Sequence, residues 1–174
     1  ASQEMSIAKD MDLIYDLKMQ RSDKESPLKS LYEQFYGRMD SAQKAVWDKF
    51  YTPIIDKFYK DDLKGEDLVR WKYQRYMHDY LRVIHSVDRN IGIVLDYLEK
   101  NDLLDNTLIV YTSDQGFYMG EHGWFDKRFM YEESFRTPLL MRLPGGKKGD
   151  IPQLVQNIDY APTFLELAGV PIPA

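Results

Sequence analysis

The sequence predicts an α/β architecture in which helices cover a small sheet, and three features carry this prediction. Apolar residues recur at i, i+3, i+4 and i+7 between residues 80 and 98, which indicates a long amphipathic helix. Residues 108–112 (LIVYT) and 138–143 (PLLMRL) are short apolar runs of the kind that forms buried strands. Residues 160–168 predict a second helix, because Gly169 and two prolines follow them. This order of helix, strand, loop, strand and helix favours layered α/β packing.

The N-terminal part, residues 1–68, is polar and rich in Lys, Asp and Tyr. Apolar side chains at helical spacing predict a first helix, and they are Ile7, Ala8, Met11, Ile14 and Tyr15. Residues 41–59 predict one or two short helices interrupted at Pro53. We recognise no chemistry in this part. We expect it to form a helical surface layer, with residues 69–174 forming the α/β part.

The long helix presents a single apolar stripe. Its members are Tyr80, Ile84, Val87, Ile91, Val94, Leu95 and Leu98. A stripe of this length spans about five helical turns, and we expect the helix to end near Lys100 and Asn101. The strand at 138–143 is expected to stop at residues 144–146, because proline and glycine break a strand.

Composition restricts the functional classes. The 174 residues are 44% hydrophobic and 29% charged, which is the balance of one soluble globular domain or a large part of one. The net charge of −5 and the lack of a basic stripe argue against nucleic acid as a partner. No apolar run approaches the roughly 18 residues of a membrane span. Because the chain has no cysteine, it contains no disulfide, thiolate metal site or cysteine nucleophile.

The loop that follows the first predicted strand carries candidate metal ligands. Asp114 comes directly after this strand, where α/β folds place ligand-binding side chains. Gln115 adds a neutral amide oxygen, and a carboxylate beside an amide oxygen suits a hard cation such as Ca²⁺ or Mg²⁺. Two ligands are too few for a complete site, so further oxygens must come from elsewhere. The alternative is that Asp114 merely caps a turn.

The same loop carries candidate substrate contacts. His122 lies between Gly120 and Gly123, where it can approach a substrate and exchange a proton near neutral pH. Lys127 can place an ammonium group against an oxyanion, and Arg128 can bind another acidic or hydroxyl group. The alternative is that both are ordinary surface charges whose ion-pair partners are two nearby glutamates, Glu132 and Glu133.

These residues lie in a pattern that resembles the second half of type I sulfatases, in the alkaline phosphatase superfamily. The matching segments are TSDQG at 112–116, GEHG at 120–123 with Lys127, and RTPLL at 136–140. Further matches are SVDRNIG at 86–92 and the region 157–163. The resemblance covers residues 70–170 well and the first 68 more loosely. It implies a partial alkaline-phosphatase-like sheet with covering helices, which is the C-terminal part of a sulfatase catalytic domain.

The resemblance also implies roles for individual residues. Asp114 and Gln115 become ligands of a divalent cation, usually calcium, although Gln115 departs from the commoner Asn. Lys127 becomes the lysine that binds the sulfate, and His122 lies near the substrate, so these two residues are the candidate catalytic groups. Lys127, His122 and Arg128 together are the candidate substrate-binding residues.

The nucleophile that the family uses is expected outside this chain. It is a formylglycine made from the Cys or Ser of a C/S-x-P-x-R motif, which this sequence lacks. We expect it upstream of Ala1, together with paired metal-binding aspartates, in the remainder of the sulfatase domain. The 174-residue chain alone is therefore expected to be inactive.

For the intact protein, the resemblance implies a sulfuric ester hydrolase that acts on sulfated carbohydrate. Within the family, the FDKR segment at 125–128 is most similar to enzymes that remove 6-O-sulfate from N-acetylglucosamine in glycosaminoglycans or mucins. The family implies a periplasmic, cell-surface or secreted location. One alternative is a phosphonate monoester or phosphodiester hydrolase of the same superfamily, against which Gln115 argues. Another is a non-catalytic sugar-binding derivative of the fold.

Overall fold

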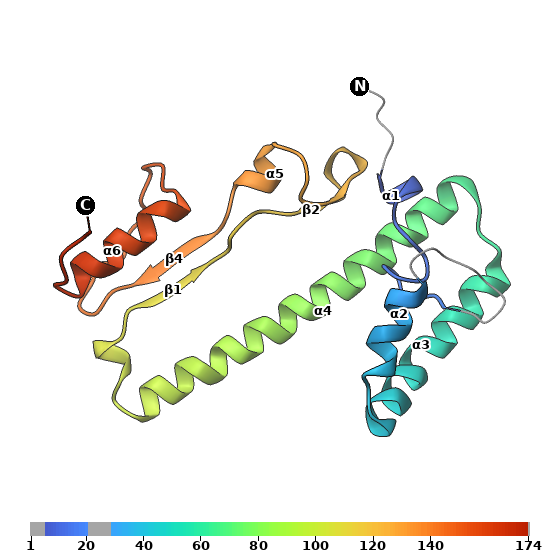
Figure 1. The fold of residues 1–174 in the computed structure, drawn as a ribbon, viewed down its shortest axis with the longest axis horizontal. Coiled ribbons are helices and arrows are strands. Elements are labelled where there is room, and N and C mark those ends of the chain that lie inside the picture. The colour runs from blue at the N-terminus through green and yellow to red at the C-terminus, as the bar shows by residue number, and fades with distance from the viewer. Residues whose placement is uncertain (1–5, 21–28, 174) are drawn as a thin grey trace.

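A computed structural model describes residues 6–20 and 29–173, and its backbone is organised along one long helix (Figure 1). The N-terminal helices are α1 (Ser6–Lys9), α2 (Lys29–Gly37), α3 (Ser41–Asp61) and α4 (Gly65–Lys100). The remaining elements are η1 (Leu104–Asn106), β1 (Ile109–Thr112), β2 (Tyr118–Met119), η2 (Glu121–Gly123), β3 (Phe125–Asp126), α5 (Glu132–Phe135), β4 (Leu139–Arg142), η3 (Asn157–Asp159) and α6 (Tyr160–Leu167). Helix α4 spans 36 residues and runs beside both the N-terminal helices and the strands.

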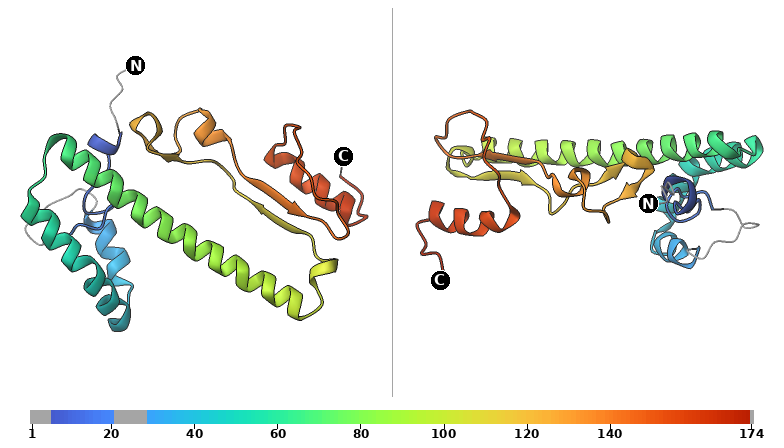
Figure 2. Two further views of the ribbon diagram at one scale, coloured as in Figure 1. Left: turned by 180° about the vertical axis from the view of Figure 1, so that it is seen from behind. Right: turned by 90° about the horizontal axis from the view of Figure 1, so that it is seen from above.

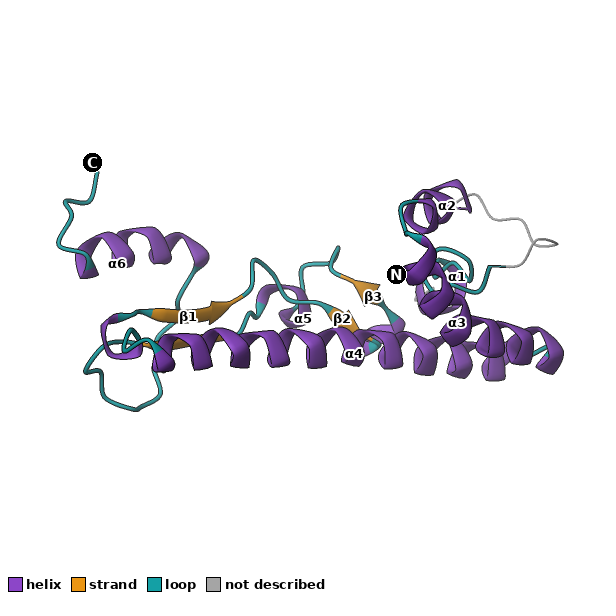
Figure 3. Cartoon of the chain, turned by 90° about the horizontal axis from the view of Figure 1, so that it is seen from below, coloured by secondary structure: helices purple, strands orange, loops and turns teal. Residues whose placement is uncertain are grey.

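The strands form two small antiparallel pairs. β1 pairs with β4, with Ile109 opposite Arg142 and Thr112 opposite Leu139. β2 pairs with β3 in a short hairpin that the glycine-rich sequence did not predict. The β1–β4 pair lies between α4 on one side and α6 on the other, as two views agree (Figures 2 and 3). The predicted layering of helices over strands is thus confirmed, as are the positions of both predicted strands, but the residues of β1 and β4 are half-buried or exposed and none is buried.

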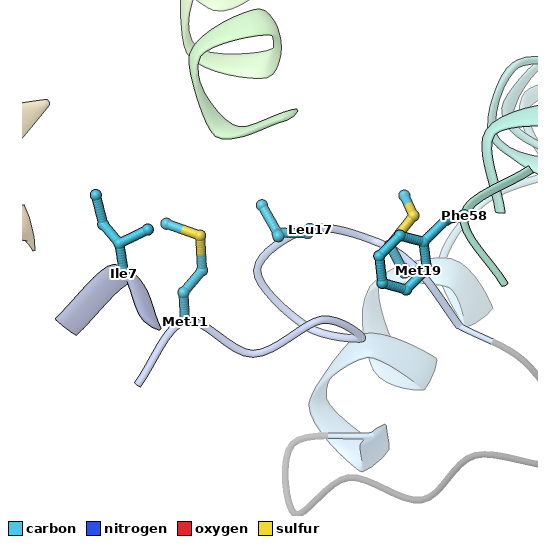
Figure 4. Packing of buried hydrophobic residues seen from close by; sticks show 5 residues of the cluster. All are labelled: Ile7, Met11, Leu17, Met19 and Phe58. Atoms are coloured by element: carbon cyan, nitrogen blue, oxygen red, sulfur yellow. The ribbon is translucent and has the colours of Figure 1, made fainter. Parts of the chain in front are cut away.

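A small core joins the N-terminal segment and α3 to α4, and Figure 4 shows its five buried members. It is built from Ile7, Met11, Leu17, Met19 and Phe58. The ring centroid of Phe58 lies 4.2 Å from that of Trp71 on α4. The buried ammonium of Lys72 donates to the carbonyl oxygens of Ala8 at 3.2 Å and Met11 at 2.9 Å. Burial lowers the pKa of Lys72, and the two carbonyls replace the water that this group loses.

The first predicted helix is much shorter than its apolar spacing suggests. Helix α1 ends at Lys9, and a turn follows in which the Asp12 carboxylate accepts hydrogen bonds from the backbone of Ile14 and Tyr15, at 2.8 and 2.6 Å. Aspartate side chains compete in this way with helical hydrogen bonds. Ile7, Met11 and Ile14 are nevertheless buried, so the apolar spacing predicted their burial correctly and the length of the helix wrongly.

The predicted interruption at Pro53 is also wrong, because α3 is one continuous helix. A proline inside a helix removes one backbone donor and leaves the carbonyl four residues earlier without its partner. That residue is Lys49, which is exposed like Pro53, so water can satisfy the carbonyl. Phe58, beyond the proline, gains burial in the core if the helix continues.

The predicted helix ends are confirmed. Helix α4 stops at Lys100, as the stripe suggested, and its start at Gly65 lies before the proposed division between residues 68 and 69. Helix α6 stops at Leu167, and Gly169 follows with a φ of +70°. A positive φ of this kind favours glycine after a helix. Among the described residues, no helix is both long and apolar enough to cross a bilayer.

The C-terminal half of α4 leaves its apolar stripe uncovered. Every residue from 81 to 90 is exposed, and Val87 and Val94 retain 41% and 58% of their accessible surface. Between this face and β1 lies an open groove of about 930 Å³. Its lining includes Val83, Val87, Ile91, Val94 and Leu95 of α4 and Ile109 of β1. An apolar face of this extent is characteristic of an interface.

Because the groove exposes apolar surface, we expect the isolated chain to bind the apolar dye anilinonaphthalene sulfonate. Replacing Val87 or Val94 by lysine should reduce the dye's fluorescence enhancement by roughly half, since the charge disrupts the apolar surface. Val46→Lys is the matched control, because Val46 on α3 is 71% exposed and lies outside the groove lining. Equal losses in all three variants would show that the dye binds elsewhere.

Candidate active-site loop

The end of β1 places the candidate metal ligands at the surface. Asp114 is exposed and Gln115 is half-buried. The Ser113 hydroxyl donates to Asp114 Oδ1 at 3.3 Å and to the Gln115 carbonyl at 2.8 Å. The side-chain amide of Asn157, in η3, donates to the Asp114 carbonyl at 3.0 Å. The backbone of this loop is therefore held from two directions, while the Asp114 carboxylate stays open to solvent.

Gly116 fixes the loop against α5. Its N–H donates to the carbonyl of Ser134 at 2.7 Å. A Cβ at position 116 would lie 2.0 Å from the carbonyl oxygen of Glu133, well inside van der Waals contact. Only glycine allows two backbones to approach this closely. The segment that carries Asp114 and the segment that carries Glu133 are thus locked together.

His122 lies in a tight turn with left-handed backbone on both sides. Gly120 and Gly123 have φ values of +116° and +74°, and His122 itself has a φ of +57°. A Cβ at Gly120 would meet the ring of Tyr73 on α4 at 2.6 Å. The imidazole Nε2 lies 3.3 Å from Oε1 of Glu133. Among the described residues, Glu133 therefore pairs with His122. It does not pair with Lys127 or Arg128, as the alternative of ordinary surface charges had suggested.

Aromatic rings surround His122. Its ring centroid lies 5.3 Å from that of Tyr131, 5.4 Å from Trp124 and 6.3 Å from Tyr118. Trp124 stacks in turn on Phe129 with 4.2 Å between centroids. These contacts restrict the orientation of the imidazole ring.

Tyr118 joins this cluster to α4. Its side chain is fully buried, and its hydroxyl donates to the Phe129 carbonyl at 3.0 Å. Its own carbonyl accepts from the Tyr76 hydroxyl at 3.1 Å. Burial raises the pKa of Tyr76 well above its ordinary value, so the hydroxyl stays protonated and remains a donor. Tyr80, one turn further along α4, stacks on Phe117 at 5.6 Å.

Lys127 and Arg128 follow β3 and are exposed. Arg128 Nε donates to Asp126 Oδ2 at 2.7 Å, which ties the guanidinium to the preceding strand. In the part of the chain that the structure describes, no carboxylate lies within ion-pair distance of the Lys127 ammonium. An unpaired ammonium remains available to an anionic ligand.

The oxygen atoms at the end of β1 fit part of a hard-cation site. They are one carboxylate, from Asp114, and one amide oxygen, from Gln115. Residues 6–20 and 29–173 contain no cluster of three or more His, Cys, Asp or Glu side chains that could hold a metal. Within these ranges, the two candidate ligands alone are too few for a complete site, so further oxygens would have to come from elsewhere.

Sequence reasoning missed the residues that support this loop. Glu133, Asn157 and the α4 tyrosines act through contacts between segments far apart in the chain, which spacing does not reveal. The N-terminal part was expected to be only a surface layer, yet α1 packs against η2, the turn that holds His122. The only available signal was the regular spacing of Tyr73, Tyr76 and Tyr80 along one helix face.

Comparisons with known proteins identify several similar sequences and structures. Residues 120–174 match the family described as N-sulphoglucosamine sulphohydrolase, C-terminal. An N-acetylglucosamine-6-O-sulfatase from Bacteroides thetaiotaomicron is 50% identical over 99% of this chain, which covers 31% of that protein.

Two solved structures are also similar. The first is BT4656 in complex with its substrate D-glucosamine-2-N,6-O-disulfate, with a TM-score of 0.85 and 48% identity over 98% of this chain and 35% of that one. The second is a phosphonate monoester hydrolase from Silicibacter pomeroyi, with a TM-score of 0.57 and 34% identity over 65% of this chain and 22% of that one. The chain spans about a third of the length of the relatives that it matches along its whole extent.

The contact at Gly116 predicts a loss of stability on substitution. Gly116→Ala should lower the free energy of unfolding by roughly 1–3 kcal/mol, because the added Cβ must push α5 away. Gly37→Ala is the matched control, since a Cβ there meets nothing within 4 Å. Urea unfolding of both variants measures the difference, and a Gly116→Ala variant as stable as Gly37→Ala would contradict the close approach.

Proposed function

Because the chain belongs to the sulfatase family of the alkaline phosphatase superfamily, we propose that the protein of which it is part hydrolyses sulfuric esters of sugars. The observation that carries the proposal is the 50% identity to an N-acetylglucosamine-6-O-sulfatase across nearly the whole chain, including the active-site loop. The substrate class that we propose is glucosamine carrying a 6-O-sulfate, as found in glycosaminoglycans or mucins. The likeness to a structure that holds glucosamine disulfate supports this class.

The loop residues have distinct parts in this proposal. The exposed ammonium of Lys127 neutralises negative charge on the sulfuryl group as the ester bond breaks. His122 moves a proton to the sugar oxygen that leaves, since an imidazole can give up a proton near neutral pH. Arg128, tied at Nε to Asp126, turns its remaining donors toward the polar groups of the sugar.

We propose that Asp114 and Gln115 contribute ligands to a divalent cation, with calcium the best fit to their oxygens. When bound, the cation supplies positive charge against the sulfate oxygens, and a formylglycine from the rest of the protein supplies the nucleophile. Ser113 and Asn157 hold the backbone of the ligand loop through the hydrogen bonds described above.

The remainder of the sulfatase domain is the partner that we propose for the apolar groove. The groove is open and apolar, and the chain spans only about a third of its relatives' length, so most of such a protein lies outside it. Covering the groove and completing the cation site both require that remainder. The isolated chain is accordingly proposed to be inactive.

The family resemblance also suggests a location. Similar proteins include an extracellular sulfatase homologue, which supports a location outside the cytoplasm. We propose a periplasmic, cell-surface or secreted protein.

Phosphonate or phosphodiester hydrolysis is the second candidate function, because a phosphonate monoester hydrolase shares the fold. That likeness covers 65% of the chain, whereas the likeness to the glucosamine disulfate complex covers 98%, so sulfate is the better supported substrate. Comparing turnover of a sulfate ester and a phosphonate monoester by the intact protein separates the two. Binding of sulfated sugar without turnover of either would instead support a sugar-binding derivative.

The role of Lys127 predicts a strong loss of activity. In the intact protein, Lys127→Ala should lower kcat/KM for sulfate release from glucosamine 6-O-sulfate by roughly 100-fold or more, since one charge-stabilising donor is lost. Lys148→Ala removes the same charge from an exposed loop beyond β4 and should leave the rate unchanged. Sulfate release is followed by ion chromatography, and an undiminished rate for Lys127→Ala would remove this lysine from the site.

The ligand role of Asp114 predicts a loss of metal. Asp114→Asn in the intact protein should weaken calcium binding by roughly tenfold or more, because an amide offers the cation no net charge. Asp150→Asn, in an exposed loop, is the control. Calcium content after dialysis, measured by mass spectrometry, reports the change. Equal content in both variants would assign Asp114 to turn capping.

A further inference from the structure

We propose that Glu133 is a positioning residue for His122. Its carboxylate holds a hydrogen on Nε2 in both charge states of the ring, so Nδ1 is the nitrogen that carries the second proton of the imidazolium, gives it to the departing sugar oxygen and takes a proton back from water. This inference rests on the proposed function, because it assigns the working atom of a histidine already placed at the substrate.

The distance between the two side chains carries the first step. Oε1 of Glu133 lies 3.3 Å from Nε2 of His122. A carboxylate is only an acceptor, so it stabilises the form of the ring that bears hydrogen on the facing nitrogen. In a neutral imidazole only one nitrogen carries hydrogen, and the partner of one nitrogen therefore decides the state of the other.

The surroundings of the ring carry the second step. Among the described residues, the hydrogen bonds and ion pairs of the structure leave His122 Nδ1 without a protein partner. The imidazole is 48% exposed, so a ligand can reach it, whereas Glu133 is 27% exposed and lies further inside. The rings of Tyr131 and Trp124 flank the imidazole and limit its rotation. Nε2 thus faces the carboxylate, and Nδ1 is left for the substrate.

The backbone of Glu133 carries the third step, because a positioning residue must itself be fixed. The Glu133 carbonyl abuts Gly116 so closely that no side chain fits there. The next carbonyl, of Ser134, accepts from the Gly116 N–H at 2.7 Å. Glu133 is therefore attached to the loop that carries Asp114 while its carboxylate reaches His122. Glu133 therefore links the loop of Asp114, the candidate cation ligand, to His122, the candidate proton donor.

The neighbouring glutamate supplies a matched control. Glu132 lies in the same short helix and carries the same charge, but it is exposed and forms no ion pair within the described segments. Glu132→Gln and Glu133→Gln change the net charge equally. Only the second removes the carboxylate from His122, and a glutamine amide can either accept from Nε2 or donate to it, so it no longer selects one state of the ring.

The first test is a double-mutant cycle on sulfate release by the intact protein. Glu133→Gln should lower kcat roughly 10- to 100-fold with a smaller change in KM, as outer partners of functional histidines do. In a His122→Ala background the same substitution should have no further effect, since the positioned group is gone. Glu132→Gln should leave both backgrounds unchanged. A loss of the same factor with and without His122, or no loss at all, would overturn the proposal.

The second test reads the ring directly and does not depend on turnover. In the intact protein labelled with ¹⁵N-histidine, the His122 signal is assigned by its disappearance in His122→Ala. At a pH at which the ring is neutral, the nitrogen shifts should show hydrogen on Nε2, and Glu133→Gln should shift them toward a mixture of the two neutral forms. A neutral ring with its hydrogen on Nδ1 in the unsubstituted protein would refute the inference. If that protein releases no sulfate, the proposed function falls, while this measurement still decides the pairing.

Discussion

The close approach of Gly116 to the carbonyl of Glu133 is the constraint on which the arrangement of the candidate site depends. A side chain at position 116 would need the space that this carbonyl occupies. The contact joins the end of β1 to α5, and α5 in turn reaches the turn that holds His122. Three segments that are separate in the sequence are therefore held at one spacing by packing of backbone against backbone. Such packing resists rearrangement better than exposed side-chain contacts do, because no rotamer change relieves it.

Helix α4 plays two different roles along its length. Its first half is packed, with Trp71 and Lys72 against the N-terminal core and Tyr76 against the loop. Its second half carries an equally regular apolar stripe that has almost nothing against it. Exposed apolar surface on this scale lowers solubility, so an uncovered stripe along a 36-residue helix is characteristic of an interaction surface. The contrast indicates that the first half of the helix finds its packing partners among the described residues, whereas the second half presents an apolar face that they leave uncovered.

The sequence predicted the elements whose signals are local. The strands at 109–112 and 139–142, the end of α4 and the glycine after α6 follow from propensity, periodicity and backbone conformation. It failed where a side chain competed with the backbone, as Asp12 does after α1, and where solvent could satisfy a broken helical bond, as at Pro53.

The candidate site divides in the same way. Asp114, His122 and Lys127 are visible because their chemistry and spacing are unusual, although their functional roles remain predictions. Glu133 has an ordinary place in an acidic pair, and only the fold brings its carboxylate to the imidazole. Contacts of this kind depend on the path of the chain between two segments, which the residues at either end do not encode.

The exposure of the site and the openness of the groove have a common physical origin. Asp114, Lys127 and Arg128 all face solvent, where water screens a charge pair at about 4 Å to roughly 1 kcal/mol. Stabilising a sulfuryl transition state by several kcal/mol requires the same charges in a site from which water is excluded. Under the proposed function, the walls of such a site come from the remainder of the protein, since the described residues leave both the groove and these charges open. We then expect that covering the apolar groove also shields the charges of Asp114, Lys127 and Arg128 from water and strengthens their electrostatic effect.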